Sequence, residues 1–506
     1  MTRGDGDDLL VAAPLRLEAR ALRAGAPGAA VIHTGMGPRR ARKAAARIGA
    51  HPAAALAIAG FCGALDPALE PGDIVVASEI RGPSGTISCP AASILAGALR
   101  RRGIAAHCGP LVSVGRIAGP RRRRELRASG AMAVDMESAW LAAAAGGRPL
   151  AVLRAVVDAP GRELTRPLAT VAGGLHAYRA LRAATPVLGE WGAAVRPREV
   201  LLAAPRASCA GVDRAVGIVE AALEARGAPL YVRHQIVHNT HVVAELERRG
   251  AVFVDELVGV PDGATVVFSA HGVSPAVRRE AAARSLEVID ATCPLVSKVH
   301  GEARRFAESG HTILLIGHEG HEEVEGVTGE APERIRVVAD VGAAREVEVE
   351  DPERVAYLTQ TTLAVDETAE VVDELAARFP ALAGPASADI CYATQNRQDA
   401  VKALAADCDR MLVIGSANSS NSKRLVEVAE REGSSARLIE DETAIDLQWL
   451  ADAATLGVTA GASAPESLVA GVLTALGGLG PVSAQERRVA SETMQFKMAA
   501  GLRKRG

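Results

Sequence analysis

Short apolar runs alternate with amphipathic helical segments along most of the chain, and this alternation restricts the fold more than any other feature. In the first part of the sequence the apolar runs resemble buried strands: LLVAAP, AAVIHTG, ALAIAG, DIVVAS and LAVLRAVVD. Helical patterns fall between some of them, at Pro38–Ile48, Ala139–Ala145 and Leu168–Ala183. Strands that alternate with helices are typical of a mainly parallel sheet covered by helices. The sequence therefore predicts an α/β fold.

The chain is too long for one hydrophobic core. It has 506 residues, so two or more domains are expected. Thr185–Glu199 (TPVLGEWGAAVRPRE) carries proline, glycine and charge without an apolar period, which is typical of a linker. After it the strand pattern restarts with VLLAAP, LYVRH, ATVVFSAHG, LEVIDATCP, HTILLIGH, VAYLTQTT, MLVIGSANSS and LGVTAGASAP. We therefore predict a domain over residues 1–185, a linker over 186–198 and a second domain over 199–506.

Charge and composition exclude several classes of protein. The formal net charge is −3 and 48% of the residues are hydrophobic, which is typical of a globular protein rather than a nucleic-acid binder or a disordered chain. The N-terminus lacks the apolar core of a signal peptide, and the most apolar stretch, Ala139–Val157, is interrupted by glycine and arginine. Basic runs such as Arg121–Arg124 are interpreted as solvated helix starts. We expect a cytoplasmic protein without a membrane span.

Three of the seven cysteines occupy equivalent places in the second part of the chain. Cys209, Cys293 and Cys391 each lie at or just after the end of a predicted strand, and they are too far apart for a CxxC metal motif. Taken singly, each is a buried small hydrophobe as readily as a ligand. Three thiolates that converge on one point suit an iron–sulfur cluster better than zinc, which takes four protein ligands when it is structural.

Donors of another kind accompany these cysteines. His238, His271 and His321 lie at predicted strand ends, while Ser419, Ser420, Asn421 and Ser463 open predicted helices. A helix start that is rich in hydroxyl and amide groups favours a diphosphate, because its free backbone N–H groups and its dipole attract anions. A simple cluster of N-caps and turns explains NSSNS equally well.

These segments together resemble the family of 4-hydroxy-3-methylbut-2-enyl diphosphate reductase, the last enzyme of the non-mevalonate isoprenoid pathway. The resemblance begins near residue 200 and rests on CAGVDRA, YVRHQIVHN, PDGATVVFSAHGVS, DATCPLVSKVH, IGHEGHEEVEG, TQTTLAVDET, DICYATQNRQ, GSANSSNSKRL, GVTAGASAP and the tail QFKMAAGLR. It implies a three-lobed α/β fold in which each lobe gives one cysteine to a central 4Fe–4S cluster. One iron then carries no thiolate, and a Lewis acid there polarises the substrate hydroxyl.

The resemblance also implies roles for individual residues. Cys209, Cys293 and Cys391 match the cluster ligands. Glu323 matches the proton source, with Thr361 relaying to the substrate hydroxyl. The diphosphate and substrate contacts match His238, His271, His321, Thr361, Thr362, Thr394, Ser419, Ser420, Asn421 and Ser463. Hydroxide is a poor leaving group, so a carboxylic acid has to protonate it as the C–O bond breaks. Without the resemblance, Glu323 would be interpreted as a surface helix carboxylate.

Reduction by two electrons then gives isopentenyl or dimethylallyl diphosphate. No flavin or nicotinamide fingerprint occurs in the chain, so a separate ferredoxin or flavodoxin is implied as the electron donor. The chain departs from the family pattern at two places. Ala207 and Ser208 stand where Gly-Phe usually precedes the first cysteine, and Glu322 stands where proline usually separates the histidine from the catalytic glutamate.

The first part of the chain resembles the purine nucleoside phosphorylase and methylthioadenosine/adenosylhomocysteine nucleosidase superfamily, most closely the hopanoid-associated branch that acts on adenosylhopane. The resemblance rests on HTGMGPRRA, AGFCGALDPALEPGDIVVAS, SVGRIAG, GAMAVDMESAW and LRAVVDAP. It implies that Met136 and Glu137 grip the ribose and that Asp158 protonates the purine leaving group. Glu18 matches an acidic residue near the nucleophile.

Two features of this first part leave its activity open. Val157 replaces the serine that often precedes the catalytic aspartate, and Cys62 lies near the usual glycine pair. Gly35 and Gly37, with Arg39 or Arg116, could hold phosphate, or they form a glycine turn beside solvated arginines.

Three hypotheses follow. The chain is a fusion of a reductase and a nucleoside-cleaving enzyme, or a reductase with a silent N-terminal binding or oligomerisation domain. In the third, the cysteines are structural or bind zinc, and the second part binds diphosphate without redox chemistry.

Overall fold

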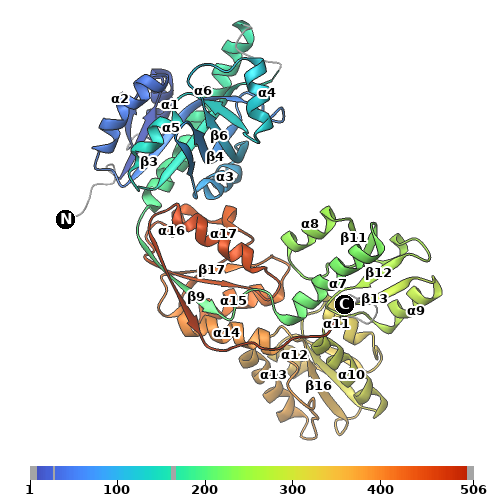
Figure 1. Cartoon of the computed structure of the whole chain (residues 1–506). Helices are drawn as coiled ribbons and strands as arrows, with labels where there is room; N and C mark the ends of the chain where they lie inside the picture. The colour runs from blue at the N-terminus through green and yellow to red at the C-terminus, as the bar shows by residue number, and fades with distance from the viewer. Residues whose placement is uncertain (1–7, 27–28, 161–166, 499–506) are drawn as a thin grey trace. The chain divides into compact units, whose positions relative to one another are not determined.

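The computed structural model describes residues 8–26, 29–160 and 167–498, and it divides the chain into two compact units (Figure 1). Unit 1 contains Met1–Val200 together with Asp441–Leu456 and Ala470–Ala484. Unit 2 contains Leu201–Glu440, Gly457–Val469 and Gln485–Gly506. Each unit has its own sheets and core, so the expectation of more than one domain in this chain is met.

The sheet of unit 1 has eight strands: β1 (Leu9–Ala13), β2 (Ala30–His33), β3 (Ala55–Ala64), β4 (Ile74–Gly82), β5 (Gly85–Ser88), β6 (Ala106–Ser113), β7 (Ala133–Asp135) and β8 (Leu150–Asp158). Strand β8 pairs with both β3 and β4, which closes β3, β8, β4, β6 and β7 into a ring. Most pairs are parallel, as the alternating pattern predicts, but β3–β7, β4–β5 and β4–β8 are antiparallel. The sheet is therefore mixed.

Helices cover this sheet: α1 (Arg16–Gly25), α2 (Pro38–Gly49), α3 (Ala92–Arg101), α4 (Pro120–Ala128), α5 (Ser138–Ala142) and α6 (Pro167–Ala194), with a 3₁₀ turn at Ala143–Ala145. The predicted helices at Pro38–Ile48 and Ala139–Ala145 are confirmed within a residue or so. The core consists mainly of alanine, valine, leucine and isoleucine, because the chain contains only 3% aromatic residues.

The segment that the sequence suggests as a linker is helical for most of its length. Helix α6 continues through Pro186 to Ala194, and strand β9 begins at Arg198. Val187, Leu188 and Trp191 are fully buried, at the spacing of one helix face. The prediction of an irregular segment is wrong because proline, glycine and charge hide this apolar period, and because the chain accommodates the lost hydrogen bond at Pro186.

Unit 2 contains three further sheets, each with its own helices (Figure 1). The first has the order β11-β10-β12-β13 and the second β15-β14-β16, and all their pairs are parallel. The third has the order β18-β17-β19-β9-β20. The boundaries between the two units fall within three of its strands, β9, β19 and β20. The predicted three-lobed architecture is confirmed.

The strands of these three sheets are β9 (Arg198–Ala204), β10 (Leu230–Arg233), β11 (Ala251–Val254), β12 (Thr265–Phe268), β13 (Glu287–Asp290), β14 (Thr312–Ile316), β15 (Ile335–Val338), β16 (Val355–Thr359), β17 (Arg410–Ile414), β18 (Ser435–Ile439), β19 (Thr455–Ala460) and β20 (Val482–Arg488). The helices are α7 (Ala210–Arg226), α8 (Thr240–Arg248), α9 (Pro275–Ala283), α10 (Pro294–Glu308), α11 (Glu322–Thr328), α12 (Val341–Glu346), α13 (Val365–Arg378), α14 (Tyr392–Ala405), α15 (Ser420–Arg431), α16 (Leu447–Leu450) and α17 (Glu466–Gly477). Within the described residues, no helix has the length and apolar character needed to cross a membrane.

The buried face of α6 generates a prediction about stability. Trp191 is fully buried and its indole N–H donates to the Gly478 carbonyl at 3.2 Å. We expect Trp191→Ala to lower the free energy of unfolding by about 3–5 kcal/mol, because it leaves a large cavity. Trp191→Phe should lose less, since most of the packing remains. Urea unfolding of the full chain measures both changes, with the exposed Leu17→Ala as the control. An unchanged Trp191→Ala protein would contradict the packing described for α6.

Candidate active sites

One cavity in unit 2 collects every residue that the sequence predicts for the diphosphate and metal site. Segments from all three sheets line it, although they lie far apart in the chain. The predicted residues on its wall are Cys209, His238, His271, Cys293, His321, Glu323, Thr361, Thr362, Cys391, Thr394, Ser419, Ser420, Asn421 and Ser463. Parallel strands place their carboxyl ends at one edge of a sheet, which explains why residues such as Cys209 and Cys293, which follow β9 and β13, meet here. The prediction of a strand before Cys391 is wrong, because the structure has no strand between helices α13 and α14.

The three cysteines each form the N-cap of a helix. Cys209 caps α7, Cys293 caps α10 and Cys391 caps α14. A Cβ atom added at Gly211 would lie 2.8 Å from the Cys293 sulfur and 3.7 Å from the Cys209 sulfur, so these two sulfurs flank the same glycine. Helix N-termini carry partial positive charge, which stabilises thiolates and any anionic group bound between them.

Burial governs the protonation of these thiols. It raises the pKa of Cys293 to about 11 and that of Cys391 to about 12, against opposing backbone N–H groups of the first helical turns. Without a metal the two thiols are therefore protonated at neutral pH. A metal centre that binds them has to displace these protons, as is general for thiolate ligands. The donor set suits an iron–sulfur group, because three sulfur ligands from three helices meet in one cavity.

Three imidazoles form a second cluster on the cavity wall. The rings of His238 and His271 stack with centroids 4.1 Å apart, and His321 meets them edge-on at 5.6 and 6.0 Å. Burial lowers the pKa of His238 to about 3 and that of His321 to about 4, with the neighbouring imidazoles acting in the same direction. Both rings are therefore neutral hydrogen-bonding groups when no anion is bound.

The cap of helix α11 fixes the tautomer of one of these rings. His321 Nδ1 accepts the backbone N–H of Glu323 at 3.1 Å, which leaves the ring proton on Nε2. Ser463 Oγ donates to the His238 carbonyl at 2.9 Å and so fixes the backbone of His238.

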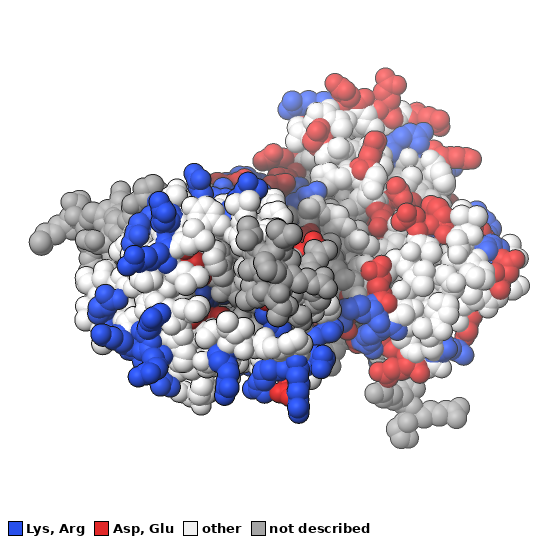
Figure 2. Space-filling model, turned by 90° about the horizontal axis from the view of Figure 1, so that it is seen from above, with Lys and Arg blue, Asp and Glu red and all other residues white. Residues whose placement is uncertain are grey.

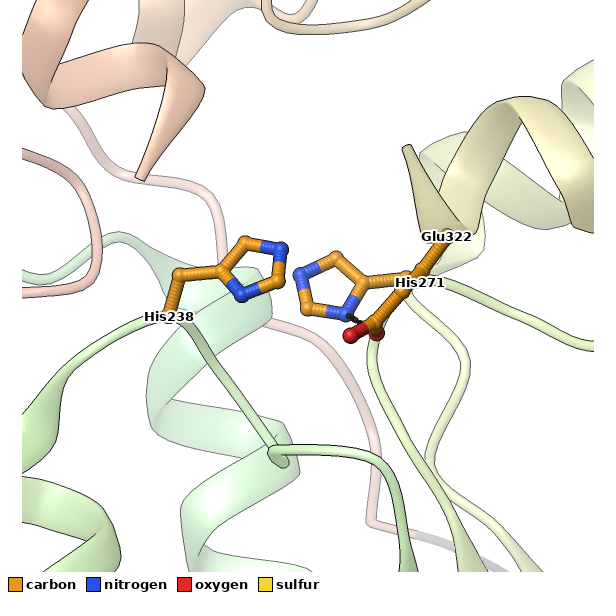
Figure 3. A group of neighbouring side chains, drawn as sticks. All are labelled: His238, His271 and Glu322. Carbon is orange, nitrogen blue, oxygen red and sulfur yellow. Dashed lines mark ion pairs between the residues drawn. The ribbon is translucent and has the colours of Figure 1, made fainter. Parts of the chain in front are cut away.

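Glu322 places a negative charge beside this cluster of imidazoles. In the sequence, Glu322 was noted only as a departure from the family pattern. Its carboxylate lies 2.9 Å from His271 Nδ1 and 3.3 Å from His234 Nδ1. Figure 3 shows the rings of His238 and His271 facing each other, with Glu322 against the second ring. Burial alone would raise the pKa of Glu322, but the hydrogen bonds from His234 and His271 hold it well below its usual range. The ligand atoms of His238, His271 and Glu322 lie within 4.8 Å of one another, a donor set that could also hold a cation.

Glu323 is a buried acid rather than a surface carboxylate. It is 2% exposed, whereas the neighbouring Glu319 and Glu325 are exposed. Its Oε1 accepts the Thr361 backbone N–H at 2.7 Å and its Oε2 accepts the Thr361 hydroxyl at 2.9 Å. Burial raises its pKa, although both hydrogen bonds from Thr361 oppose the shift. A carboxyl group in such a place can hold a proton and give it to a ligand in the cavity.

Both interpretations of the NSSNS segment are compatible with the geometry. Ser419 is the N-cap of α15, and its side chain accepts the Ser422 N–H at 3.3 Å. Asn421 is 5% exposed, and neither its amide oxygen nor its amide nitrogen has a hydrogen-bond partner among the described residues. Buried polar atoms are normally satisfied, so Asn421 is available to a ligand in the cavity.

Unit 1 contains a second cavity, which brings together the residues predicted for nucleoside cleavage. Glu18, Met136, Glu137 and Asp158 all line it. Glu137 Oε1 accepts the Gly37 N–H at 2.7 Å, and Gly37 has a φ of +90°, a conformation that favours glycine. Within the described residues, neither Arg39 nor Arg116 lines this cavity, so the predicted phosphate contacts are not among its walls.

Two buried arginines neutralise acids around this cavity, and sequence reasoning missed both. Arg154 pairs with Asp135 at 2.6 Å and is completely buried. Arg123 pairs with Asp158 at 2.5 Å. The run Arg121–Arg124 was predicted to be solvated, and this is wrong for Arg123, which is 7% exposed. Helix periodicity indicates that Arg123 is buried, because Arg123 lies three residues before the apolar Leu126 on the same face of α4.

Glu18 provides a pH-dependent test of this second cavity. Its carboxylate accepts backbone N–H groups of Phe61 and Leu15, and burial raises its pKa from 4.5 to about 7. The folded chain therefore binds this proton more tightly than the unfolded chain does. The resulting stability is fully present below pH 4.5 and is lost as the pH rises to about 7.

We expect Glu18→Gln to remove this pH dependence. The difference in unfolding free energy between the native and variant chains should change by about 3 kcal/mol across this pH range. Urea unfolding at several pH values measures it, and Glu70→Gln, at an exposed position of the same unit, is the control. Parallel pH profiles for the native and Glu18→Gln proteins would contradict the assignment.

Comparisons with known proteins match the two parts of the chain to two different families. Residues 200–477 match the family model "LytB protein" and residues 18–180 match "Phosphorylase superfamily". The 4-hydroxy-3-methylbut-2-enyl diphosphate reductase of Leifsonia xyli subsp. xyli is 59% identical over 308 residues, which cover 61% of this chain and 91% of the relative. The reductase of Nocardia farcinica is 58% identical over 307 residues, covering 60% and 91%.

A solved structure matches over the same region. It is the E-1-hydroxy-2-methyl-but-2-enyl-4-diphosphate reductase from Plasmodium falciparum, with 35% sequence identity and a TM-score of 0.58, and the match covers 61% of this chain and 97% of that one. The chain belongs to the LytB family, with a phosphorylase-superfamily domain joined to its N-terminal side.

Proposed function

We propose that the C-terminal part of the chain reduces 4-hydroxy-3-methylbut-2-enyl diphosphate to isopentenyl and dimethylallyl diphosphate. One observation carries this proposal: three helix-capping cysteines, three imidazoles and a buried carboxyl group line one cavity. The Leifsonia and Nocardia relatives, which carry this activity in their names, support it at 58–59% identity. The domain limits 1–185, 186–198 and 199–506 stay a prediction.

Cys209, Cys293 and Cys391 are assigned as the ligands of one 4Fe–4S cluster per chain. The three sulfurs are positioned by separate helices, so the protein presents them without any of the local spacing that zinc fingers use. When bound, such a cluster supplies electrons and a Lewis-acidic iron that has no protein sulfur. The protein's own part is to exclude water, to hold the substrate and to provide protons.

The diphosphate is assigned to the imidazole and hydroxyl-rich wall. His238, His271 and His321 offer ring nitrogens, and Asn421 offers an amide whose atoms have no partner among the described residues. Ser419, Ser420 and Ser463 surround the N-terminus of α15 and its neighbouring loop, where the helix dipole favours an anion. Thr362 and Thr394 complete the wall and are assigned to the remainder of the substrate.

Glu323 is assigned as the acid that protonates the departing hydroxyl group. The C–O bond breaks, its oxygen takes the proton and leaves as water, and two electrons with a second proton restore a neutral C–H bond. Glu323 suits this role because burial raises the pKa of its carboxyl group and so favours the protonated form. The Thr361 hydroxyl, 2.9 Å from the carboxyl group, orients the acid and relays the proton.

The electrons are proposed to come from a separate ferredoxin or flavodoxin. The protein is proposed to work in the cytoplasm, where free thiols persist; all seven of its cysteines are free thiols.

The cluster assignment predicts the outcome of single cysteine substitutions. We expect Cys209→Ser, Cys293→Ser and Cys391→Ser each to lose most of the iron and sulfide of anaerobically purified protein, together with reductase turnover by a dithionite-reduced mediator. Cys408→Ser is the matched control, because this buried thiol of the same unit lies outside the cavity. Retention of a full cluster in any of the three variants would overturn the ligand assignment.

The N-terminal part is proposed to cleave a nucleoside, adenosylhopane or a related one. The bond between ribose and purine breaks, the purine takes a proton and the ribose takes water or phosphate. Met136 and Glu137 are assigned to the ribose, and Asp158 is assigned as the acid for the purine. The match to the phosphorylase superfamily and the shared cavity of these residues support this proposal.

A second candidate is a silent N-terminal domain that only binds or oligomerises. The buried pair between Arg123 and Asp158 favours it, because this pair occupies the carboxyl group that has to deliver a proton.

Adenine release from nucleosides separates the two candidates. If the domain is active, we expect Asp158→Asn to lower adenine release at least about 100-fold, the usual scale for a lost general acid. Glu70→Gln is the control in the same unit, and reductase turnover should be the same in all three proteins. Release that is absent from the native chain, or unaffected by Asp158→Asn, would favour the silent domain.

A further inference from the structure

Each reductive turnover consumes the proton of a carboxyl group that solvent barely reaches. Glu323 is 2% exposed, and its two oxygens are occupied by the backbone N–H and the hydroxyl of Thr361. Under the proposed function this proton leaves with the substrate oxygen, so it has to be replaced before the next turnover. A proton carrier inside the protein is therefore needed beside Glu323.

His300 on helix α10 has the position and the free ring nitrogen for this task. It is 5% exposed, its Nδ1 lies 2.7 Å from Glu330 Oε1, and its Nε2 has no hydrogen-bond partner among the described residues. With an ionised Glu330, the hydrogen bond keeps a proton on Nδ1. The ring can then pick up and release a second proton at Nε2, which is otherwise a buried lone pair.

The free nitrogen lies against the helix that carries Glu323. A Cβ atom added at Gly326 would lie 3.3 Å from His300 Nε2, and Gly326 is three residues after Glu323 on α11. Residues at this spacing are neighbours on one helix face, so Nε2 lies within about one helical turn of the acid. Gly272, which follows His271, approaches Nε2 from the other side, at 2.7 Å from an added Cβ atom.

Glu330 holds the imidazole in place from the opposite side. Its carboxylate also accepts from Arg304 at 2.9 Å, and the Arg304 side chain is half exposed. Burial alone would raise the pKa of Glu330, but the hydrogen bonds from His300 and Arg304 lower it, so the carboxylate stays ionised. Among the described residues, the charged or titratable groups around His300 are thus Glu330 and Arg304 at its Nδ1 and Glu323 near its Nε2.

We propose that His300, anchored by Glu330, is a positioning residue that returns a proton to Glu323 after each turnover. The imidazolium gives its Nε2 proton to the Glu323 carboxylate, directly or through one solvent molecule, and the neutral ring keeps its Nδ1 proton on Glu330. A proton from solvent then restores the imidazolium. This inference rests on the proposed reductase function, because only a reaction that consumes the Glu323 proton needs such a carrier.

The first turnover separates this role from a structural one. We expect His300→Asn enzyme that is loaded with its cofactor and supplied with a dithionite-reduced mediator to complete its first turnover at the native rate, because that turnover needs no return of a proton to Glu323. Later turnovers should be slowed at least about tenfold, giving a burst of one product per active site with KM unchanged. The deficit should be larger at about pH 8.5 than at about pH 6, where protons are more abundant. Rapid-quench product analysis of anaerobic full-length protein measures both phases.

Two further variants distinguish the loss of the proton carrier from a general effect of misfolding. Gly326→Ala leaves His300 in place but puts a methyl group against Nε2, so it should show the same burst. Glu330→Gln removes the charge that anchors His300, and its later turnovers should be slowed less than those of His300→Asn. Arg305→Gln, an exposed neighbour on α10, is the matched control and should behave as native protein. A first turnover slowed as much as the later ones, or no defect in either variant of His300 and Gly326, would overturn the proposal.

A second readout does not depend on turnover. The infrared carboxyl band that Glu323→Gln abolishes reports the proton on Glu323. In the native protein this band should shift within the mixing time after transfer to heavy water, and in His300→Asn the shift should be slower. Equal exchange rates would overturn the relay. Loss of turnover in Glu323→Gln alone would leave the reductase assignment standing, whereas full turnover in Glu323→Gln would refute the role of this acid itself.

Discussion

Three helix N-termini converge on one cavity, and the organisation of unit 2 depends on this convergence. Each of α7, α10 and α14 has a cysteine as its N-cap, so a sulfur atom and the positive end of a helix dipole lie side by side at the cavity wall. Helix dipoles favour negative charge, which offsets the cost of gathering three thiolates and a diphosphate in a small space. Helices α7 and α10 follow strands of different sheets, β9 and β13, so the cavity lies where separate sheets of unit 2 meet.

Protonation in this cavity is divided between two walls. On one wall, burial keeps His238 and His321 neutral, while Glu322 holds its charge against His271 and His234. On the other wall, burial raises the pKa of Glu323 and so favours its protonated form. An anion that enters between them stabilises imidazolium and disfavours the glutamate anion. Ligand binding should thus draw protons to both walls, which suits a reaction that consumes them.

Much of this arrangement was predictable from the sequence. Cys209, Cys293 and the imidazoles follow strands that are visible in the apolar pattern, so their meeting follows from parallel-sheet topology. The role of Glu323 was indicated only by the resemblance to the reductase family, and no strand precedes Cys391. Arg123 was not predictable in the same way, because a run of four arginines conceals the one that turns inward. The anchoring of His300 by Glu330 was also hidden, since it depends on how α10 packs against α11 and neither residue lies at a strand end. Trp191 and its neighbours on α6 were missed because proline and glycine masked a helical face.

The composition of unit 1 has a consequence for how the chain comes to fold. This unit includes Asp441–Leu456 and Ala470–Ala484 as well as the first 200 residues, and Gly478 accepts the indole N–H of Trp191. A ribosome makes these pieces only after residues 201–440. The first 200 residues thus remain an incomplete unit until Asp441–Leu456 and Ala470–Ala484 have been synthesised. Truncation near residue 200 would then yield a protein that lacks part of its own unit, rather than an independent half.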